Sequence, residues 1–235
     1  MLYLLPTPIG NLEDVSARVL RLLAEVKAVY CEDTRRTRML LSRHGISAAL
    51  IHYDDRNPRS VESALERLRR GEDVALVSDS GTPVLSDPGL KLVAGARREG
   101  LPVCSVPGPS AVAAAAAGSG LPADSFVFLG FLPRAPGRQR RMLEAAAALG
   151  KTIVVYESPH RALALLDAAG EALGLGAQTA ACRELSKVHE EWLTGSLSDV
   201  RAALAARPEI LGEFVFVFHP ESAHRGAHGE SDPMA

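Results

Sequence analysis

Several features that would mark a particular class of protein are scarce or missing in this 235-residue chain. It has only three cysteines, and no two of them form a CxxC pair. Cys31, Cys104 and Cys182 each lie in an apolar run, so they are predicted to be small core residues in a reducing compartment. The seven histidines show no metal-ligand spacing, and no metal site is predicted.

Long apolar segments and lysine are also scarce. No apolar stretch approaches the roughly 20 residues of a membrane span. The apolar start, residues 1–5, is too short for a signal peptide and meets Pro6 at once. We therefore expect a cytoplasmic protein without membrane contact. Only four of the 26 basic residues are lysines, a bias that fits either a GC-rich genome or phosphate recognition by arginine.

The overall charge gives no nucleic-acid signature. The net charge is −2 and the sequence pI is about 6.4. A polyanionic partner would therefore have to be bound by local basic patches.

What is present is an alternation of short apolar runs with amphipathic stretches. Up to about Gly118 the pattern is typical of βαβ units on a parallel sheet. Beyond it, the last three apolar runs share a single long helical pattern, which favours a mixed sheet. A strand at 191–195, close behind residues 182–187, is predicted to pair antiparallel. We predict an α/β fold with two α/β domains, at residues 1–118 and 119–220, and a cofactor cleft between them. Residues 221–235 are predicted to be a disordered polar tail.

Loops rich in glycine and proline follow three predicted strands of the first domain, at residues 6–11, 78–89 and 107–111. The carboxyl ends of parallel strands meet at one edge of a sheet, so these loops are predicted to form one ligand-binding wall. The sequences G-x-G-x-x-G and G-x-x-x-x-G-K-[ST], which cradle dinucleotides and triphosphates, are absent. Any one loop is explained by chain turning alone, but three on one edge favour a binding site.

The order of the motifs resembles a known family. The matching segments are Thr-Pro-Ile-Gly-Asn-Leu at 7–12, Cys-Glu-Asp-Thr-Arg at 31–35, Ser-Asp-Ser-Gly-Thr-Pro at 78–83 with Asp-Pro-Gly at 87–89, Pro-Gly-Pro-Ser-Ala at 107–111, Gly-Phe-Leu-Pro-Arg at 130–134, Tyr-Glu-Ser-Pro-His-Arg at 156–161 and the run from Arg183 to Glu191. Together they resemble the ribosomal RNA small subunit methyltransferase I family, ribose 2′-O-methyltransferases of the tetrapyrrole methylase superfamily. The resemblance covers about residues 2–218. Residues 53–57 depart from the His/Glu/Asn-rich stretch that the family often has there.

The resemblance implies S-adenosylmethionine as cofactor, a homodimer, and methylation of a cytidine ribose in the decoding region of 16S rRNA, free or in the small ribosomal subunit. The cofactor-binding residues predicted in the first domain are Pro8, Gly81, Thr82, Pro83, Asp87, Ser110 and Ala111. Those implied in the second domain are Tyr156, Cys182, Glu213 and Phe214. Two alternatives stay open: Asp87 as a helix N-cap, and Tyr156 and Cys182 as core packing.

Local clusters of arginine are the predicted RNA contacts. They are Arg35, Arg36, Arg134, Arg138, Arg140, Arg141 and Arg183. The segment 133–141 is the most telling, because its four arginines have one acid nearby, Glu144, and guanidinium forks match phosphate oxygens. Surface ion pairs with Glu32 and Asp33 are the alternative for the first two arginines.

Lys187 and Glu184 are the predicted catalytic residues, because they follow the apolar run 179–182 at its presumed cleft end. Lys187 would draw off the proton of a ribose hydroxyl or orient the ribose. The alternative is a structural ion pair between Glu184 and Arg183 or Lys187. Two rival functions stay open at this point: methylation of a tetrapyrrole or a protein side chain, and RNA binding without catalysis.

Overall fold

The computed structural model describes residues 1–220, and the chain divides into two compact units. Unit 1 comprises Met1–Ala114 together with Glu184–Glu190, and unit 2 comprises Ala115–Arg183 and the chain from Glu191 on. The division falls within the helix that the predicted boundary, after Gly118, places wholly in the first domain. The predicted tail, 221–235, lies outside the described residues.

Unit 1 is built on a parallel five-stranded sheet with the order β3-β2-β4-β1-β5. Its strands are β1 (Leu2–Leu5), β2 (Ala28–Cys31), β3 (Leu50–His52), β4 (Val74–Val77) and β5 (Val103–Ser105). Its helices are the short η1 (Leu12–Asp14), α1 (Ala17–Glu25), α2 (Thr34–Arg43), α3 (Pro58–Arg69), α4 (Leu90–Arg98) and the start of α5 (Ala111–Gly118). The parallel sheet predicted for this half of the chain is confirmed.

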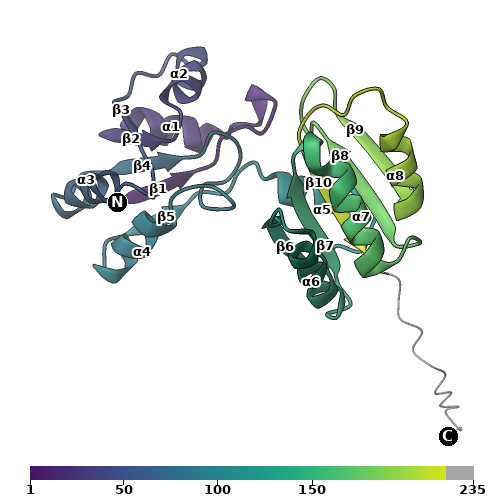
Figure 1. The fold of residues 1–235 in the computed structure, drawn as a ribbon. Helices are drawn as coiled ribbons and strands as arrows, with labels where there is room; N and C mark the ends of the chain where they lie inside the picture. The colour runs from purple at the N-terminus through teal and green to yellow at the C-terminus, as the bar shows by residue number, and fades with distance from the viewer. Residues whose placement is uncertain (221–235) are drawn as a thin grey trace, which may run out of the picture. The chain divides into compact units, whose positions relative to one another are not determined.

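Helices cover both faces of this sheet (Figure 1). On one face Leu4 and Leu76 pack with Leu65 of α3 and Leu92 of α4. On the other face the strands pack against α1 and α2, through residues such as Val19, Leu23 and Leu41. Strands buried on both faces need apolar side chains at every position, which is why β2 and β4 are continuous apolar runs in the sequence.

Unit 2 contains a second five-stranded sheet, with the order β6-β7-β10-β8-β9. Its strands are β6 (Phe126–Phe131), β7 (Thr152–Glu157), β8 (Gln178–Arg183), β9 (Glu191–Ser196) and β10 (Phe214–His219). Strands β6 and β7 pair in parallel, and the other neighbours in this sheet are antiparallel. This confirms the predicted mixed sheet, including the antiparallel pairing of β9 with β8.

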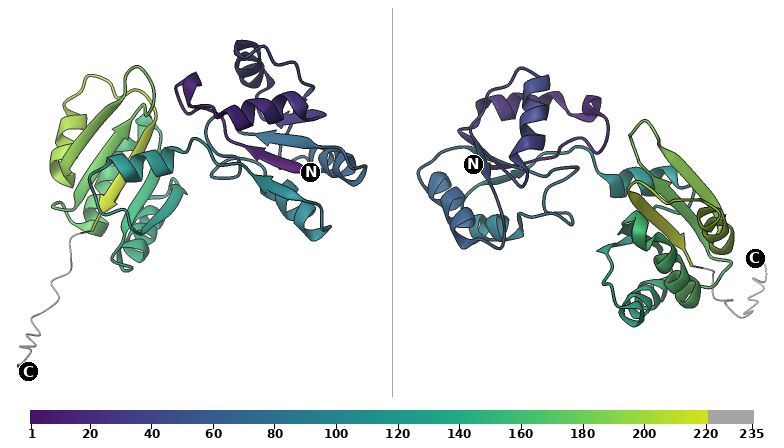
Figure 2. Two further views of the ribbon diagram at one scale, coloured as in Figure 1. Left: turned by 180° about the vertical axis from the view of Figure 1, so that it is seen from behind. Right: turned by 45° about the horizontal axis from the view of Figure 1, so that its top comes forward.

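The helices of unit 2 lie mainly on one face of its sheet (Figure 2). They are α6 (Pro136–Ala147), the short η2 (Pro159–Arg161), α7 (Ala162–Leu173) and α8 (Leu197–Ala205). Leu143, Leu165 and Val200 from three of these helices pack on Val155 and Phe216 of the sheet. On the opposite face, the end of α5 approaches β9, where a Cβ on Gly118 would lie 2.5 Å from the Trp192 ring. In the described part of the chain, no helix is long and apolar enough to cross a membrane.

Candidate functional site

The three Gly- and Pro-containing loops lie together in unit 1, because β4, β1 and β5 are neighbours in the sheet. Thr7 and Gly81 exchange two backbone hydrogen bonds of 2.9 and 3.0 Å. The Thr7 hydroxyl also donates to the carbonyl oxygen of Ser78 at 3.0 Å, and the Thr82 hydroxyl donates to that of Pro109 at 3.0 Å. These bonds join residues 6–11, 78–89 and 107–111 into one surface, called the loop wall below.

The backbone of the middle loop is held in unusual conformations. Gly81 has a φ of +81°, and a Cβ there would approach the Ile9 side chain to 3.3 Å. Val84 and Ser86 also have positive φ values, of 76° and 63°. A non-glycine residue in this region costs on the order of 1–3 kcal/mol, so the surrounding structure must hold it there. The Ser78 hydroxyl contributes by donating to the carbonyl oxygen of Gly81 at 2.6 Å.

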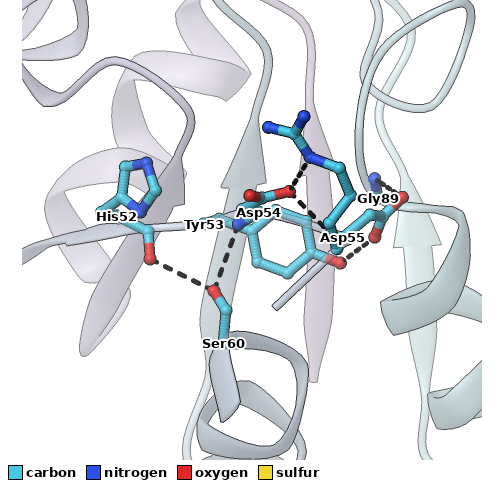
Figure 3. A network of polar contacts seen from close by, with 7 residues as sticks. His52, Tyr53, Asp54, Asp55, Ser60 and Gly89 are labelled. Atoms are coloured by element: carbon cyan, nitrogen blue, oxygen red, sulfur yellow. Dashed lines mark hydrogen bonds and ion pairs between the residues drawn. The ribbon is translucent and has the colours of Figure 1, made fainter. Parts of the chain in front are cut away.

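The loop is also anchored at its far end, by residues that follow β3 (Figure 3). The carboxylate of Asp55 accepts the backbone N–H of Gly89 at 2.9 Å, where α4 begins without a side-chain cap of its own. The buried Tyr53 hydroxyl donates to the other oxygen of Asp55. Burial, followed by the neighbouring Asp55, raises the pKa of Tyr53, which keeps this hydroxyl a donor. Sequence analysis assigned no role to residues 53–57.

Asp54 lies beside Asp55 but makes different contacts. Its carboxylate accepts hydrogen bonds from Arg56 at 2.8 and 3.1 Å, within its own turn. Its N–H donates to the Ser60 hydroxyl at 3.2 Å, and that hydroxyl donates to the carbonyl oxygen of His52 (Figure 3). Two neighbouring carboxylates therefore serve different purposes: Asp55 reaches the loop wall and Asp54 does not.

Asp87, in the same loop, is a partly buried carboxyl group with acidic neighbours. Burial raises its pKa to about 6, and the charges of Glu32 and Asp79 add to the effect. Asp79 is itself fixed, because it accepts the backbone N–H of Asp33 at 3.0 Å. Asp87 is not the N-cap of α4, since Gly89 occupies that position. The capping alternative left open by the sequence is therefore wrong.

The segment 184–190 leaves the sheet of unit 2 after β8 and belongs to unit 1 by its contacts. It packs on the first loop of the loop wall, where Gly10 has no room for a side chain. A Cβ at Gly10 would lie 2.9 Å from the Leu185 carbonyl oxygen and 3.0 Å from the Lys187 nitrogen. Ser186 adds a hydrogen bond from its hydroxyl to the carboxylate of Asp14.

Lys187 and Glu184 form an ion pair of 2.9 Å within this segment. Both side chains are partly buried, with 28% and 17% exposure. Glu184 has a φ of 52°, so the turn that presents the pair has a strained backbone. The ion pair that the sequence left as an alternative is therefore present, next to the loop wall. The catalytic role of the two residues stays a prediction.

The remaining predicted cofactor residues are divided between the units. Unit 1 holds Pro8, Pro83, Ser110 and Ala111 in the loop wall and at the start of α5. In unit 2, Tyr156 and Cys182 flank Val215, because β10 lies between β7 and β8. Glu213 directly precedes β10, and the Phe214 side chain belongs to the core under the helices. Their contact with a cofactor stays a prediction.

The predicted RNA-binding arginines fall into two groups. Three are held by other parts of the protein: Arg35 by Asp33, Arg140 by Glu144 and Glu171, and Arg183 by Glu191 and the carbonyl oxygen of Leu211. The other four are exposed and have no side-chain hydrogen bond or ion pair within residues 1–220: Arg36, Arg134, Arg138 and Arg141. Among those same residues, no group of three His, Cys, Asp or Glu side chains is placed to hold a metal ion.

Comparison with known proteins identifies the family of this chain. The family model for tetrapyrrole (corrin/porphyrin) methylases matches residues 1–201. Ribosomal RNA small subunit methyltransferase I of Hydrogenobaculum sp. is 41% identical over 94% of this chain and 96% of that protein. The protein of the same name from Mesorhizobium japonicum is 44% identical over 99% of this chain and 80% of that protein. The chain belongs to this family of methylases.

Comparison with a solved structure identifies the fold. Uroporphyrin-III C-methyl transferase from Thermus thermophilus, complexed with S-adenyl homocysteine, superposes with a TM-score of 0.65 at 20% identity. It covers 92% of this chain and 96% of its own. The predicted two-sheet fold of the tetrapyrrole methylases is thus confirmed. The predictions that the chain belongs to this family and that it is a methyltransferase that uses S-adenosylmethionine are also confirmed.

Proposed function

We propose that this protein methylates the 2′-hydroxyl of a cytidine ribose in 16S rRNA, in the decoding region, with S-adenosylmethionine as methyl donor. The observation that carries the proposal is the loop wall with segment 184–190 packed on it. Relatives more than 40% identical over nearly the whole chain are named as ribosomal RNA small subunit methyltransferases, which supports the substrate class.

The loop wall suits this cofactor by its chemistry. S-adenosylmethionine supplies a methyl group on a positively charged sulfur. Burial, followed by the charges of Glu32 and Asp79, raises the pKa of Asp87 to about 6, and a positively charged sulfur beside these carboxyl groups would be favoured. Backbone N–H groups at the start of α5, near Ser110 and Ala111, would donate hydrogen bonds to the cofactor carboxylate. Tyr156, Cys182 and Glu213 are proposed to contact its adenosine.

The reaction is a direct displacement. The ribose oxygen forms a bond to the methyl carbon while the carbon–sulfur bond breaks, and its electron pair stays on the sulfur of the departing S-adenosylhomocysteine. Orientation of the hydroxyl against the methyl group accounts for much of the rate. Glu184 is proposed to accept the released proton, and the Lys187 ammonium group that is paired with it to orient the ribose.

The exposed arginines would provide the affinity for RNA. Arg36, Arg134, Arg138 and Arg141 have no side-chain partner within residues 1–220, so they are the favoured contacts for phosphate oxygens. Arg35, Arg140 and Arg183 would have to leave their acidic or carbonyl partners, which lowers their expected contribution. A cytoplasmic location and a homodimer belong to the same proposal, and sedimentation of the purified chain tests the dimer.

The decisive experiment is methylation of small ribosomal subunits from cells that lack the protein. With labelled S-adenosylmethionine, we expect label at a cytidine 2′-oxygen of 16S rRNA, mapped by resistance of the neighbouring linkage to alkaline cleavage. Label in a tetrapyrrole or protein acceptor, with none in RNA, would favour the rival enzymes. Binding of RNA without transfer of label would favour the noncatalytic alternative.

Cofactor binding is tested separately by calorimetry with S-adenosylhomocysteine. Gly81→Val should abolish binding, because a branched side chain would meet Ile9 at a positive φ. Gly71→Val is the matched control: Gly71 has a similar φ of +78°, but open space lies around its missing Cβ. Equal loss of binding in both variants would show that backbone strain, and not the loop wall, is responsible.

A further inference from the structure

Strand β6 lies at one edge of the unit 2 sheet (Figure 1). It carries two exposed aromatic side chains. Phe131 at its end is 60% exposed, and Phe126 at its start is 38% exposed. An isolated exposed phenylalanine needs no special explanation in a soluble domain. Phe131 is different because three further features of the structure bear on it.

The first feature is an irregularity in the strand. Phe128 lies opposite Val154 of β7, but Gly130 lies opposite Val155 and Phe131 opposite Tyr156, so Leu129 is an extra residue. Gly130 takes a φ of +62° at this bulge. In a regular strand Phe131 would share a face with Val127 and Leu129, which pack on the core under the helices. The bulge instead turns Phe131 to the face of Phe128, away from that core.

The second feature is the ring cluster that results. The Tyr156 ring lies 4.9 Å from that of Phe128 and 5.5 Å from that of Phe131, at interplanar angles of 69° and 59°. These are edge-to-face and tilted contacts, which aromatic rings prefer. Phe131 is therefore supported by Tyr156 while most of its surface stays exposed, as in a platform on which a flat ligand can stack.

The third feature is the charge that follows in the chain. Arg134, Arg138 and Arg141 are exposed and have no side-chain partner in the described part of the protein, whereas Arg140 is paired with Glu144 and Glu171. Arg138 and Arg141 lie in the first turns of α6, where positive charge opposes the helix dipole. Cations that have no partner among residues 1–220 and that closely follow a supported aromatic ring in the chain fit the backbone and base of a single-stranded nucleic acid.

We propose that Phe131 stacks on one unpaired base of the RNA substrate while Arg134, Arg138 and Arg141 bind the flanking phosphates. The inference rests on the proposed function, and it adds a nucleotide-binding site in unit 2. A second copy of the chain fits this surface less well. A symmetric contact centred on this surface would bring the positive charges of the two copies close together.

The test compares Phe131→Leu with Phe131→Trp and with Phe126→Leu. Phe126→Leu is the matched control, because it removes an exposed ring from the other end of β6. The probe is a single-stranded RNA copy of the decoding-region sequence containing 2-aminopurine, whose fluorescence falls on stacking. Phe131→Leu should weaken RNA binding about 10-fold and abolish the quenching. Phe131→Trp should keep both, and Phe126→Leu should behave as wild type.

Salt dependence separates stacking from phosphate contact. Phe131→Leu should leave the slope of affinity against salt unchanged, because no charge is removed, and should leave S-adenosylhomocysteine binding unchanged. If Phe131→Leu keeps the wild-type RNA affinity, the proposed stacking on Phe131 is wrong and the proposed function is unaffected. Equal loss of S-adenosylhomocysteine affinity would assign the ring to the cofactor, and an altered sedimentation mass would assign it to a contact between copies. If the wild-type chain binds no RNA, the proposed function fails as well.

Discussion

Asp87 is a carboxyl group in surroundings that disfavour its ionised form. Its carboxyl group lies where burial and the charges of Glu32 and Asp79 all disfavour ionisation, so its pKa rises to about 6. At neutral pH the group is ionised at a cost to folding, which a bound cation would offset. Destabilised groups of this kind are common at functional sites, because stability is lost where ligand binding is gained.

The pH dependence of stability follows from the sign of this shift. The stabilising contribution of protonated Asp87 is complete below its unfolded pKa near 3.8 and is lost as the pH rises through about 6. Asp87→Asn should therefore stabilise the protein by about 1 kcal/mol more at pH 8 than at pH 5. Urea unfolding at both pH values measures this difference. A constant difference between variant and wild type would show that Asp87 is not desolvated.

Asp55 and Asp54 offer a second comparison of neighbouring residues. Asp55→Ala removes the acceptor for the Gly89 amide and for the buried Tyr53 hydroxyl, and should cost about 2 kcal/mol of unfolding free energy. Asp54→Ala removes an exposed pair with Arg56 and should cost clearly less than Asp55→Ala. Denaturant titration of both variants checks the difference. Equal costs would mean that Asp55 does not anchor the loop.

The sequence could predict some of these residues and not others. Gly81 and Asp87 were predicted as site residues because they lie in a strand-end loop whose composition is visible in the chain. Tyr53 and Asp55 were given no role, since their importance depends on a hydrogen bond to Gly89 across the sheet end. No local pattern encodes that contact.

At the scale of elements, α6 should show which arginines bind RNA. Arg138→Ala and Arg141→Ala, combined, should weaken RNA binding and reduce the salt slope by about 2, because each free cation displaces roughly one counterion. Arg140→Ala is the control, since this guanidinium is already paired with Glu144 and Glu171. Filter binding at several salt concentrations measures the slopes. If Arg140→Ala reduces the slope as much as the double variant, the pairing does not decide RNA contact.

The elements themselves were largely predictable from the sequence. The apolar runs gave the strands of unit 1 and their parallel arrangement, and the short connection after residue 187 gave the antiparallel pairing of β9. The bulge in β6 was not predicted, because the run from Phe126 to Leu129 has the composition of an ordinary buried strand. Gly130 is the one residue of β6 whose type indicates a bulge. Whether the bulge forms there depends on the register of β6 against β7.

At the scale of the whole molecule, the chain passes from unit 1 to unit 2, returns to unit 1 for one short segment, and then completes unit 2. Segment 184–190 lies between β8 and β9 of unit 2, yet its contacts place it in unit 1. The hydrogen bond from Ser186 to Asp14 joins residues 172 positions apart. Such a contact depends on the folded topology, so the sequence could predict Lys187 and Glu184 as site residues but not their place in unit 1.

This placement makes the role of the pair testable apart from cofactor binding. Lys187 lies beside Gly10 of the loop wall, so its variants should act on the methyl-transfer step itself. Lys187→Ala and Glu184→Ala should each lower the single-turnover rate by about 100-fold, the lower range for a lost proton-transfer group. S-adenosylhomocysteine affinity should change less than about twofold, because the loops of the wall are joined without either side chain.

Val188→Ala is the control within the same segment, since this side chain is 95% exposed and should leave the rate unchanged. A loss of rate in all three variants would mean that the segment only needs its fold. Wild-type rates in Lys187→Ala and Glu184→Ala would instead leave the ribose proton to solvent. The enzyme would then work by positioning its two substrates, and the strained turn at Glu184 would serve only to pack the segment on Gly10.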